Sequence, residues 1–381
     1  MEYRKIGKTA YQTSVISLGT EWIYDADDSV IDRVVGEAID RGINLIDMVV
    51  PGEKTRRGVG KAIKGKRDKL IIQGHLCSTD LNDRFDISRD LDTVKKYFEM
   101  MLAALETDYI DFGMLFLIDT EQDYDDVFNS NIIEYAMDLK EKGIVRHLGA
   151  SSHNVETATR VINTGLIDLI MFPVNAAFDV INANGDNVDL MEEKANLIKN
   201  VGGAARAQFY RLCERKNIAI VGMKPFAGGK LLMEAFSPFN EPMTTGQCIQ
   251  YALTRPGVVT ALAGCASVEE VVDCVNYFNL SDKQRDYSKV IVRAKESFEG
   301  SCVYCNHCEP CAAQIHIAKV HQALDIALLD KSHVPKEVIE KYNALDAHGS
   351  DCTRCGSCEK RCPFAVPIIE NMRKAHEIFG R

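Results

Sequence analysis

CVYCNHCEPC, residues 302–311, and CTRCGSCEKRCP, residues 352–363, are the two stretches that decide how the C-terminal part of this chain folds. The second has the spacing C-x2-C-x2-C-x3-C-P, whose thiolates bind [4Fe-4S] clusters. The first repeats this spacing, with its fourth cysteine one residue earlier. Structural zinc sites usually combine C-x2-C pairs rather than two runs of four cysteines. The sequence therefore predicts two [4Fe-4S] clusters. Their expected ligands are Cys302, Cys305, Cys308, Cys311, Cys352, Cys355, Cys358 and Cys362.

Two pairings of these cysteines with the clusters are open. In two-cluster proteins with this spacing, the last cysteine of each run binds the other cluster. Cys362 would then join the first three cysteines of the first run, and Cys311 the first three of the second. The alternative gives each cluster four consecutive cysteines. Pro363 follows the second run but Pro310 precedes the last cysteine of the first, so the first cluster is harder to predict.

Length and composition limit the class of protein. The chain has 381 residues, 46% of them hydrophobic, which suffices for one large domain and one small one. Its net charge of −10 argues against a nucleic-acid partner, which requires a basic face. No apolar run reaches the roughly 18 residues of a membrane span, and no apolar segment follows Met1. The 13 cysteines therefore suggest reduced thiols and metal ligands in a cytoplasmic protein.

Residues 1–290 alternate short apolar segments with amphipathic ones. The apolar segments predict strands at 15–18, 44–47, 70–73, 111–117, 147–151, 169–174, 219–225 and 259–264. The amphipathic segments predict helices at 30–40, 91–106, 127–142, 155–163, 204–215, 246–254 and 268–277. Ser267 and Glu270 form the expected capping box of the last helix. Eight strand and helix repeats favour a closed (β/α)8 TIM barrel over an open doubly wound sheet, the main alternative.

Two further regions complete the predicted organisation. Residues 177–203 follow the sixth strand and contain a charged helical stretch at 190–199; they form either a loop over the active face or a surface elaboration without a role. Residues 291–381 are expected to form a small α-helical domain around the clusters. Its helices are predicted at 315–330, 335–345 and 367–379.

The barrel region resembles the aldo/keto reductase family. The resemblance is carried by RKIGKT (4–9), VISLGT (15–20), GINLID (42–47), GIVRHLGASSH (143–153) and KPFAGG (224–229). The cysteine runs are similar to those of a subgroup in which such a barrel is fused to a ferredoxin-like module with two clusters. This resemblance implies an aldo/keto reductase-like barrel over residues 1–290 and a ferredoxin-like domain over residues 291–381.

The catalytic groups of that family are largely replaced in this sequence. The resemblance implies hydride transfer from NAD(P)H to a carbonyl, with an Asp, a Tyr, a Lys and a His at the site. Asp47 matches the aspartate. The segment from Asp47 to Gly52 is one residue shorter than the family motif and lacks its tyrosine, while His75 aligns with the lysine and Phe116 with the histidine. Phenylalanine cannot hydrogen-bond a carbonyl, so the ordinary family reaction is not expected.

Asp47 and His75 are the candidate catalytic residues. If the geometry of the family holds, they face each other across the barrel mouth as a carboxylate and an imidazole suited to acid–base catalysis. The alternative for His75 is a histidine satisfied within the core. Other polar residues at strand ends are Glu21, Glu53 and Cys77. Cysteines outside the two runs are expected to act as small buried hydrophobic residues.

The resemblance also implies a nucleotide site at the mouth. Its expected residues are Gly19, Thr20, Ser151, Lys224, Gly264 and Ser267. Ser152 and Met171 replace the asparagine and the glutamine of the family. The helix N-terminus after Gly264 suits a phosphate, but the loop has no lysine or arginine for a 2′-phosphate. A flavin or NAD(H) is therefore a possible cofactor, and NADP is the least favoured. The alternative to nucleotide binding for Lys224 is a structural role or the binding of another anion.

Three functions remain open from the sequence. The first is an iron–sulfur oxidoreductase, related to aldo/keto reductases, whose two clusters pass electrons to or from a substrate or cofactor in the barrel mouth. The second is a non-catalytic electron-transfer or scaffold subunit of a larger redox complex. The third is an NAD(P)H-dependent carbonyl reductase with a modified proton donor. The first two imply a ferredoxin-like or other redox protein as partner.

Overall fold

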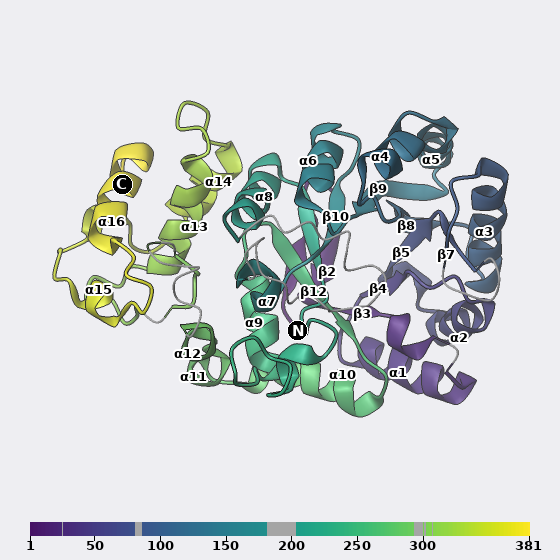
Figure 1. Ribbon diagram of the computed structural model, residues 1–381, viewed down its shortest axis with the longest axis horizontal. Helices are drawn as coiled ribbons and strands as arrows, with labels where there is room; N and C mark the ends of the chain where they lie inside the picture. The colour runs from purple at the N-terminus through teal and green to yellow at the C-terminus, as the bar shows by residue number, and fades with distance from the viewer. Residues whose placement is uncertain (25, 81–85, 181–202, 293–299, 301, 307) are drawn as a thin grey trace.

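The computed structural model describes residues 1–24, 26–80, 86–180, 203–292, 300, 302–306 and 308–381 (Figure 1). The helix predicted at 190–199 and most of the insertion around it lie outside these residues. Within the described part of the chain, no helix is long and apolar enough to cross a membrane.

Eight parallel strands close into a barrel. Around the barrel their order is β3, β4, β5, β8, β9, β10, β11 and β12, with β12 pairing to β3. Each coincides with one of the eight predicted strands, so the prediction of a TIM barrel is confirmed and the open sheet is excluded. The strands are β3 (Ile16–Gly19), β4 (Leu45–Met48), β5 (Ile71–Leu76), β8 (Ile110–Leu115), β9 (Val145–Ser151), β10 (Leu169–Pro173), β11 (Ala219–Met223) and β12 (Val258–Gly264).

Helices surround the barrel, and most lie where the amphipathic pattern predicted them. The helix predicted at 127–142 is found at 131–141, where Ser130 accepts a hydrogen bond from Ile132 N and starts it, and the helix before it, at 121–128, was not predicted. The helix at 53–63 was missed because Gly58 and Gly60 weaken its apolar pattern. Gly60 allows close packing: a Cβ there would lie 2.5 Å from Ala104 O. The helices are α1 (Asp28–Asp40), α2 (Glu53–Ile63), α3 (Leu91–Ala104), α4 (Glu121–Phe128), α5 (Asn131–Glu141), α6 (Val155–Asn163), α7 (Ala176–Val180), α8 (Gly203–Lys216), α9 (Thr245–Leu253) and α10 (Val268–Val275).

Two layers of apolar side chains hold the barrel together. One fills its interior, where alternate residues of the strands point inward. The other lies between the strands and the surrounding helices. Two short antiparallel pairs were not predicted: β1 (Tyr3–Lys5) with β2 (Gln12–Ser14), and β6 (Ser78–Thr79) with β7 (Asp86–Ile87). Strands of two or three residues are too short to give a readable alternation.

The C-terminal region packs beside α8 and α9, at one end of the molecule (Figure 1). Gln322 Nε2 donates to Thr254 O over 2.9 Å, and Lys341 pairs with Glu214 at 2.5 Å. A third apolar core joins the two regions, and Val290 and Ile291, on either side of the predicted boundary, are both buried in it. The helices are α11 (Asp282–Arg285), α12 (Ser288–Ile291), α13 (Ile317–Ala327), α14 (Lys336–Asn343), α15 (Ser357–Arg361) and α16 (Ile368–Phe379).

Candidate functional site

Strained backbone marks the C-terminal ends of the barrel strands. Cys77, Leu117 and Lys224 have positive φ angles of 72°, 53° and 54°. They follow β5, β8 and β11 by one or two residues. L-residues rarely adopt this conformation, and such strain is concentrated at functional sites. Because (β/α)8 enzymes build their sites at this end of the barrel, the mouth is the first candidate site.

Asp47 and His75 are hydrogen-bonded to each other. Adjacent strands β4 and β5 present them, and their register sets Asp47 beside Gln73. His75 Nε2 lies 2.7 Å from Asp47 Oδ1, and Gln73 Nε2 donates to the same oxygen over 2.6 Å. An ionised carboxylate only accepts, so His75 Nε2 carries the proton and Nδ1 is left as an acceptor. Within the described residues Nδ1 has no partner, and both side chains are buried. The pair can hold or accept a proton, but protein atoms enclose it.

The other two positions aligned with the family's catalytic groups lie close by. The Phe116 ring meets the His75 ring edge-on, with centroids 5.1 Å apart. A Cβ at Gly52 would lie 2.6 Å from Tyr24 Cε2, so the Tyr24 ring lies directly against the segment that has lost its tyrosine. Tyr24 belongs to the loop after β3, and no sequence pattern connects it with Gly52. Sequence reasoning therefore missed it.

Lys224 lies beside two residues that the sequence did not single out. Its Nζ is 3.0 Å from His153 Nε2, and His153 Nδ1 is 3.0 Å from Asp119 Oδ2. The three residues follow β11, β9 and β8 at the barrel mouth. They are separated by 71 and 34 positions in the sequence. Only the closed barrel brings them together.

Three residues predicted to bind a nucleotide are engaged within the barrel itself. Thr20 Oγ1 donates to Asp47 O over 2.8 Å, and Ser151 Oγ accepts from Leu117 N over 2.8 Å. Thr20 and Ser151 are buried. Gly19 pairs with Asp47 on one side and with Gly264 on the other. These contacts hold neighbouring strand ends together.

The predicted phosphate loop is partly closed by its own side chains. Ser267 Oγ accepts from Glu270 N over 3.3 Å, as predicted. The Glu270 carboxylate accepts from Ala266 N over 2.6 Å instead of from Ser267 N, so the capping box predicted here is wrong in this second bond. A Cβ at Gly264 would lie 2.0 Å from Trp22 Cδ1, which places the indole against the loop. A carboxylate at this helix N-terminus opposes a bound phosphate.

The remaining strand-end residues do not join the Asp47 and His75 pair. Glu21 and Glu53 are exposed, and Glu53 pairs with Arg57 on α2 at 3.2 Å. Cys77 is buried, and burial raises the pKa of its thiol. The prediction that cysteines outside the two runs are buried is confirmed. The others are Cys213, Cys248, Cys265 and Cys274.

The two cysteine runs have left-handed residues at the same two places. In the first run, Tyr304 and Asn306 flank the second cysteine, and their φ angles are 58° and 63°. At the same places in the second run, Arg354 and Gly356 have φ angles of 57° and 72°. Left-handed residues in such loops turn successive backbone N–H groups toward one concave side and form sites for anions, including iron–sulfur clusters.

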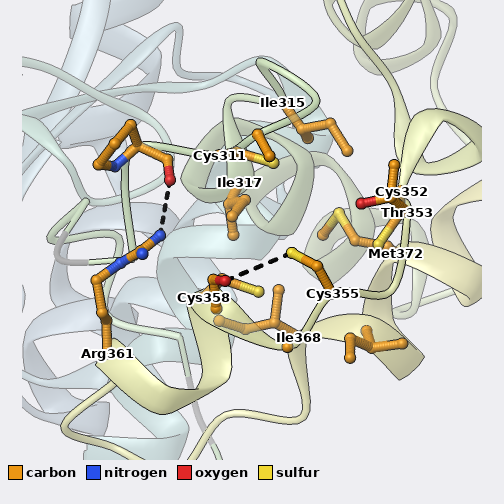
Figure 2. Close-up of a pocket in the computed structure, with 15 residues that line it drawn as sticks. Cys311, Ile315, Ile317, Cys352, Thr353, Cys355, Cys358, Arg361, Ile368 and Met372 are labelled. Atoms are coloured by element: carbon orange, nitrogen blue, oxygen red, sulfur yellow. Dashed lines mark hydrogen bonds between the residues drawn. The ribbon is translucent and has the colours of Figure 1, made fainter.

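Cys311 of the first run shares a cavity with three cysteines of the second run. The cavity holds about 380 Å³ of space, part of it open to solvent. Cys352, Cys355 and Cys358 line it together with Cys311 (Figure 2). Apolar side chains in or next to the surrounding helices form part of the wall: Ile315, Ile317, Ile368 and Met372.

The remaining four cysteines are also neighbours. Burial raises the pKa of the Cys308 thiol to about 12, with smaller contributions from nearby acidic groups that include Cys305 and Cys362. Arg361 ties the two runs together, because its Nε donates to Cys308 O over 3.1 Å and its Nη2 to Pro310 O over 2.7 Å. Each group of four cysteines thus draws on both runs.

The spacing of these sulfurs differs from that around a single metal ion. Among the described side chains, no three of His, Cys, Asp or Glu gather as they would around one ion. Four thiolates around one zinc ion would lie roughly 4 Å apart. A [4Fe-4S] cube stands between its ligands and separates them further. The four thiols that line the cavity are the donor type that such a cluster requires.

Comparison with known proteins identifies the barrel. Residues 15–244 match the profile described as the aldo/keto reductase family, which is more than half of the 381 residues. The chain belongs to the aldo/keto reductase family. Two uncharacterized oxidoreductases of Bacillus subtilis (strain 168) are similar to it. YqkF is 22% identical over 325 residues, or 81% of this chain and 99% of YqkF. YrpG is 27% identical over 144 residues, or 34% of this chain and 44% of YrpG.

Solved structures of aldo-keto reductases have the same fold. The holo form of the aldo-keto reductase AKR11C1 from Bacillus halodurans superposes with a TM-score of 0.59 at 20% identity, covering 78% of this chain and 96% of that one. A putative aldo-keto reductase from Pseudomonas aeruginosa gives a TM-score of 0.52 at 20% identity, covering 72% and 95%. The family match ends before both cysteine runs. The family match therefore accounts for the barrel of this aldo/keto reductase-like oxidoreductase, but it does not cover the cysteine runs.

Proposed function

We propose that this aldo/keto reductase-family chain is an iron–sulfur oxidoreductase. Two [4Fe-4S] clusters, when bound, would take up and release single electrons, to or from a substrate or cofactor in the barrel mouth. One observation carries the proposal: both cysteine runs have left-handed residues on either side of their second cysteine. Three of those four residues are not glycine and adopt this conformation at a cost of about 1–2 kcal/mol each. The same conformation at matching positions of both runs supports a bound group of the same kind in each.

The ligand sets we propose cross between the runs. Cys311 would complete the cluster of Cys352, Cys355 and Cys358, because these four line one cavity. Cys362 would complete the cluster of the first run, because its neighbour Arg361 donates to Cys308 O and Pro310 O. The contacts of Arg361 support this crossing, since they hold the end of the second run against the carbonyls of the first.

The first run faces the barrel, and the second faces away from it. Tyr287 OH donates to Val303 O over 2.8 Å, and Tyr304 OH donates to Asp325 Oδ2 over 2.5 Å. Arg211 of α8 donates to the same carboxylate over 2.9 Å. Cys355, in contrast, is exposed. We therefore propose that the outer cluster exchanges electrons with a ferredoxin-like or other redox protein, and that the inner cluster serves the barrel.

In the barrel, Asp47 and His75 are the proposed acid–base groups. Asp47 fixes the proton on His75 Nε2, and the open acceptor at Nδ1 is where a proton would be taken up. The proposed organic cofactor is a flavin or NAD(H). NADP remains the least favoured, because residues 264–270 include no lysine or arginine and present Glu270 to the loop. A cytoplasmic location is proposed, since reduced thiols are required.

Anaerobic purification followed by iron and sulfide analysis tests this function. Two clusters correspond to about eight irons and eight sulfides per chain. Reduction by dithionite should bleach the visible absorbance, and Cys355→Ser should lose one cluster while Cys248→Ser, at a buried cysteine in α9, keeps both. Zinc in place of iron would refute the proposal. Full cluster content without reaction with NADH, flavin or a small-molecule acceptor would favour the scaffold function instead.

A second candidate function is carbonyl reduction by NAD(P)H with a modified proton donor. The contact between Tyr24 and Gly52 favours it, because a phenol lies against the segment that has lost the family's tyrosine. Tyr24→Phe removes only the hydroxyl. Under this function, the rate of NAD(P)H-dependent reduction of a generic aldehyde should fall at least tenfold in the variant. Equal rates in wild type and variant would exclude Tyr24 as the donor.

A further inference from the structure

Three polar side chains meet at the barrel mouth, after strands β8, β9 and β11. Lys224 follows β11, which is four strands away from β5 around the eight-stranded barrel. His153 and Asp119 follow β9 and β8. Neither the Asp47 and His75 pair nor the clusters use these residues. Their arrangement therefore needs a separate explanation.

The carboxylate fixes the imidazole in one tautomer. Asp119 is buried and accepts from His153 N over 2.6 Å, from His153 Nδ1 over 3.0 Å and from Ser152 Oγ over 3.3 Å. Burial raises the pKa of this carboxyl, but its contacts with His153 and Ser152 outweigh burial, and the pKa is lowered. Asp119 is therefore ionised and His153 Nδ1 carries a proton. His153 Nε2 then accepts from the Lys224 ammonium at 3.0 Å.

The backbone holds Lys224 at the mouth at the expense of strain. Its φ angle of 54° is in the left-handed region, which lysine rarely adopts. Asn175, fully buried after β10, donates from Nδ2 to Lys224 O over 2.9 Å and secures this conformation. Residues that follow four adjacent strands, β8 to β11, thus position the Lys224 ammonium. Strain maintained by such support is typical of functional sites.

We propose that Lys224, His153 and Asp119 form a binding site for the carboxylate of a small organic acid in the barrel mouth. An ammonium has three N–H donors and can hold His153 and a ligand oxygen together. The buried carboxylate of Asp119 disfavours a doubly charged phosphate, whereas a singly charged carboxylate matches one lysine. His153 and Lys224 are only partly buried. The site rests on the proposed function in one respect, namely that the barrel mouth holds the substrate.

Binding of acetate and of pyruvate to the full-length, anaerobically purified protein tests the site. Saturation-transfer NMR gives their dissociation constants without any need for turnover. We expect saturable binding that weakens at least tenfold in Lys224→Met and severalfold in His153→Gln. Lys224→Arg should restore it, because the charge returns. Lys140→Met, which removes a half-buried lysine of α5, is the matched control and should bind as the wild type does.

The possible results separate this site from the cluster chemistry. Absence of saturable binding in the wild type, or equal binding by Lys224→Met, overturns the proposal. If Lys224→Met does not fold, as judged by circular dichroism, the comparison of His153→Gln with wild type decides in its place. A chain that binds acetate but contains no iron refutes the proposed function and leaves the site intact. A chain with full iron content that does not bind acetate refutes the site and leaves the proposed function intact.

Discussion

The barrel mouth and the cysteine region arrange their reactive groups in opposite ways. In the mouth, the residues at the family's catalytic positions are buried and bonded to one another, as in the contact of His75 with Asp47. In the C-terminal region, four thiols surround open space and are held there by strained loops. The first region encloses His75 Nδ1, which has no partner among the described residues, whereas the second leaves open space between its thiols. The comparison supports the proposal that the reactive centre extends beyond the part of the chain that defines its family.

The largest expected effect comes from the cysteine that crosses between the runs. Cys311→Ala should remove one cluster, or about four of eight irons, because it takes a ligand from the cavity shared with the second run. Iron analysis and electron paramagnetic resonance of the reduced protein measure this. The remaining signal should equal that of Cys352→Ala and differ from that of Cys302→Ala. A match with Cys302→Ala would show that each run binds its own cluster.

Removing the buried carboxylate of the mouth should produce the next largest effect. Asp47→Ala leaves the N–H groups of His75 and Gln73 without their acceptor, and each unsatisfied buried donor costs about 1–3 kcal/mol. We expect the free energy of unfolding to fall by about 2–4 kcal/mol in urea titrations. Asp282→Ala, at a fully exposed aspartate, should change it by less than about 0.5 kcal/mol. An effect of Asp47→Ala as small as this control would show that the pair is not a stabilising unit.

The Asp119 network should give a smaller, pH-dependent effect. Asp119→Asn removes the charge that fixes His153, which should lower the free energy of unfolding by about 1–3 kcal/mol at pH 7. The pKa of Asp119 is lowered in the folded state. Its contribution is therefore present above the usual carboxyl pKa of about 4 and is lost as the pH falls below that toward the folded value. The free energies of unfolding of wild type and Asp119→Asn, measured from pH 7 downward, check this. A difference between them that grows as the pH falls below about 4 would contradict the prediction.

The smallest expected effect concerns the phosphate loop. Glu270→Gln removes a negative charge that faces Ala266 N at the start of α10, a position where one charge is worth about 0.3–1 kcal/mol. NADH affinity, measured by fluorescence titration, should rise by about two- to fivefold. Glu337→Gln, in the first turn of α14, is the matched control and should change nothing. Unchanged affinity in Glu270→Gln would mean that NADH does not use this loop.

The sequence predicted the barrel because its evidence is local. Each buried strand is a short apolar segment between polar ones, so all eight strands could be read directly. Helix α2 could not, because the close contact of Gly60 with Ala104 O depends on a neighbour distant in sequence. The pairing of Asp47 with His75 was predictable through the family resemblance. The chain from Lys224 to Asp119 was not, since it joins three strand ends that only barrel closure brings together.

The cysteine runs were readable for a different reason. Their spacing matches a known ligand pattern, so the eight cysteines could be proposed as ligands without a structure. The left-handed residues beside them carried a partial signal, because Asn306 and Gly356 are residue types that tolerate positive φ. Tyr304 and Arg354 gave no such signal. Their conformation follows from the loop around them and not from their own preference.

The apolar core shared by the barrel and the C-terminal region has a consequence for the life of the protein in the cell. Residues of α9 and of the segment after β11 are buried against the same side chains that surround the cysteines. If the proposed clusters are bound, their loss would loosen one flank of the barrel and expose apolar surface to chaperones and proteases. Iron supply would then set the amount of intact enzyme, and oxidative damage to a cluster would mark the whole chain for turnover.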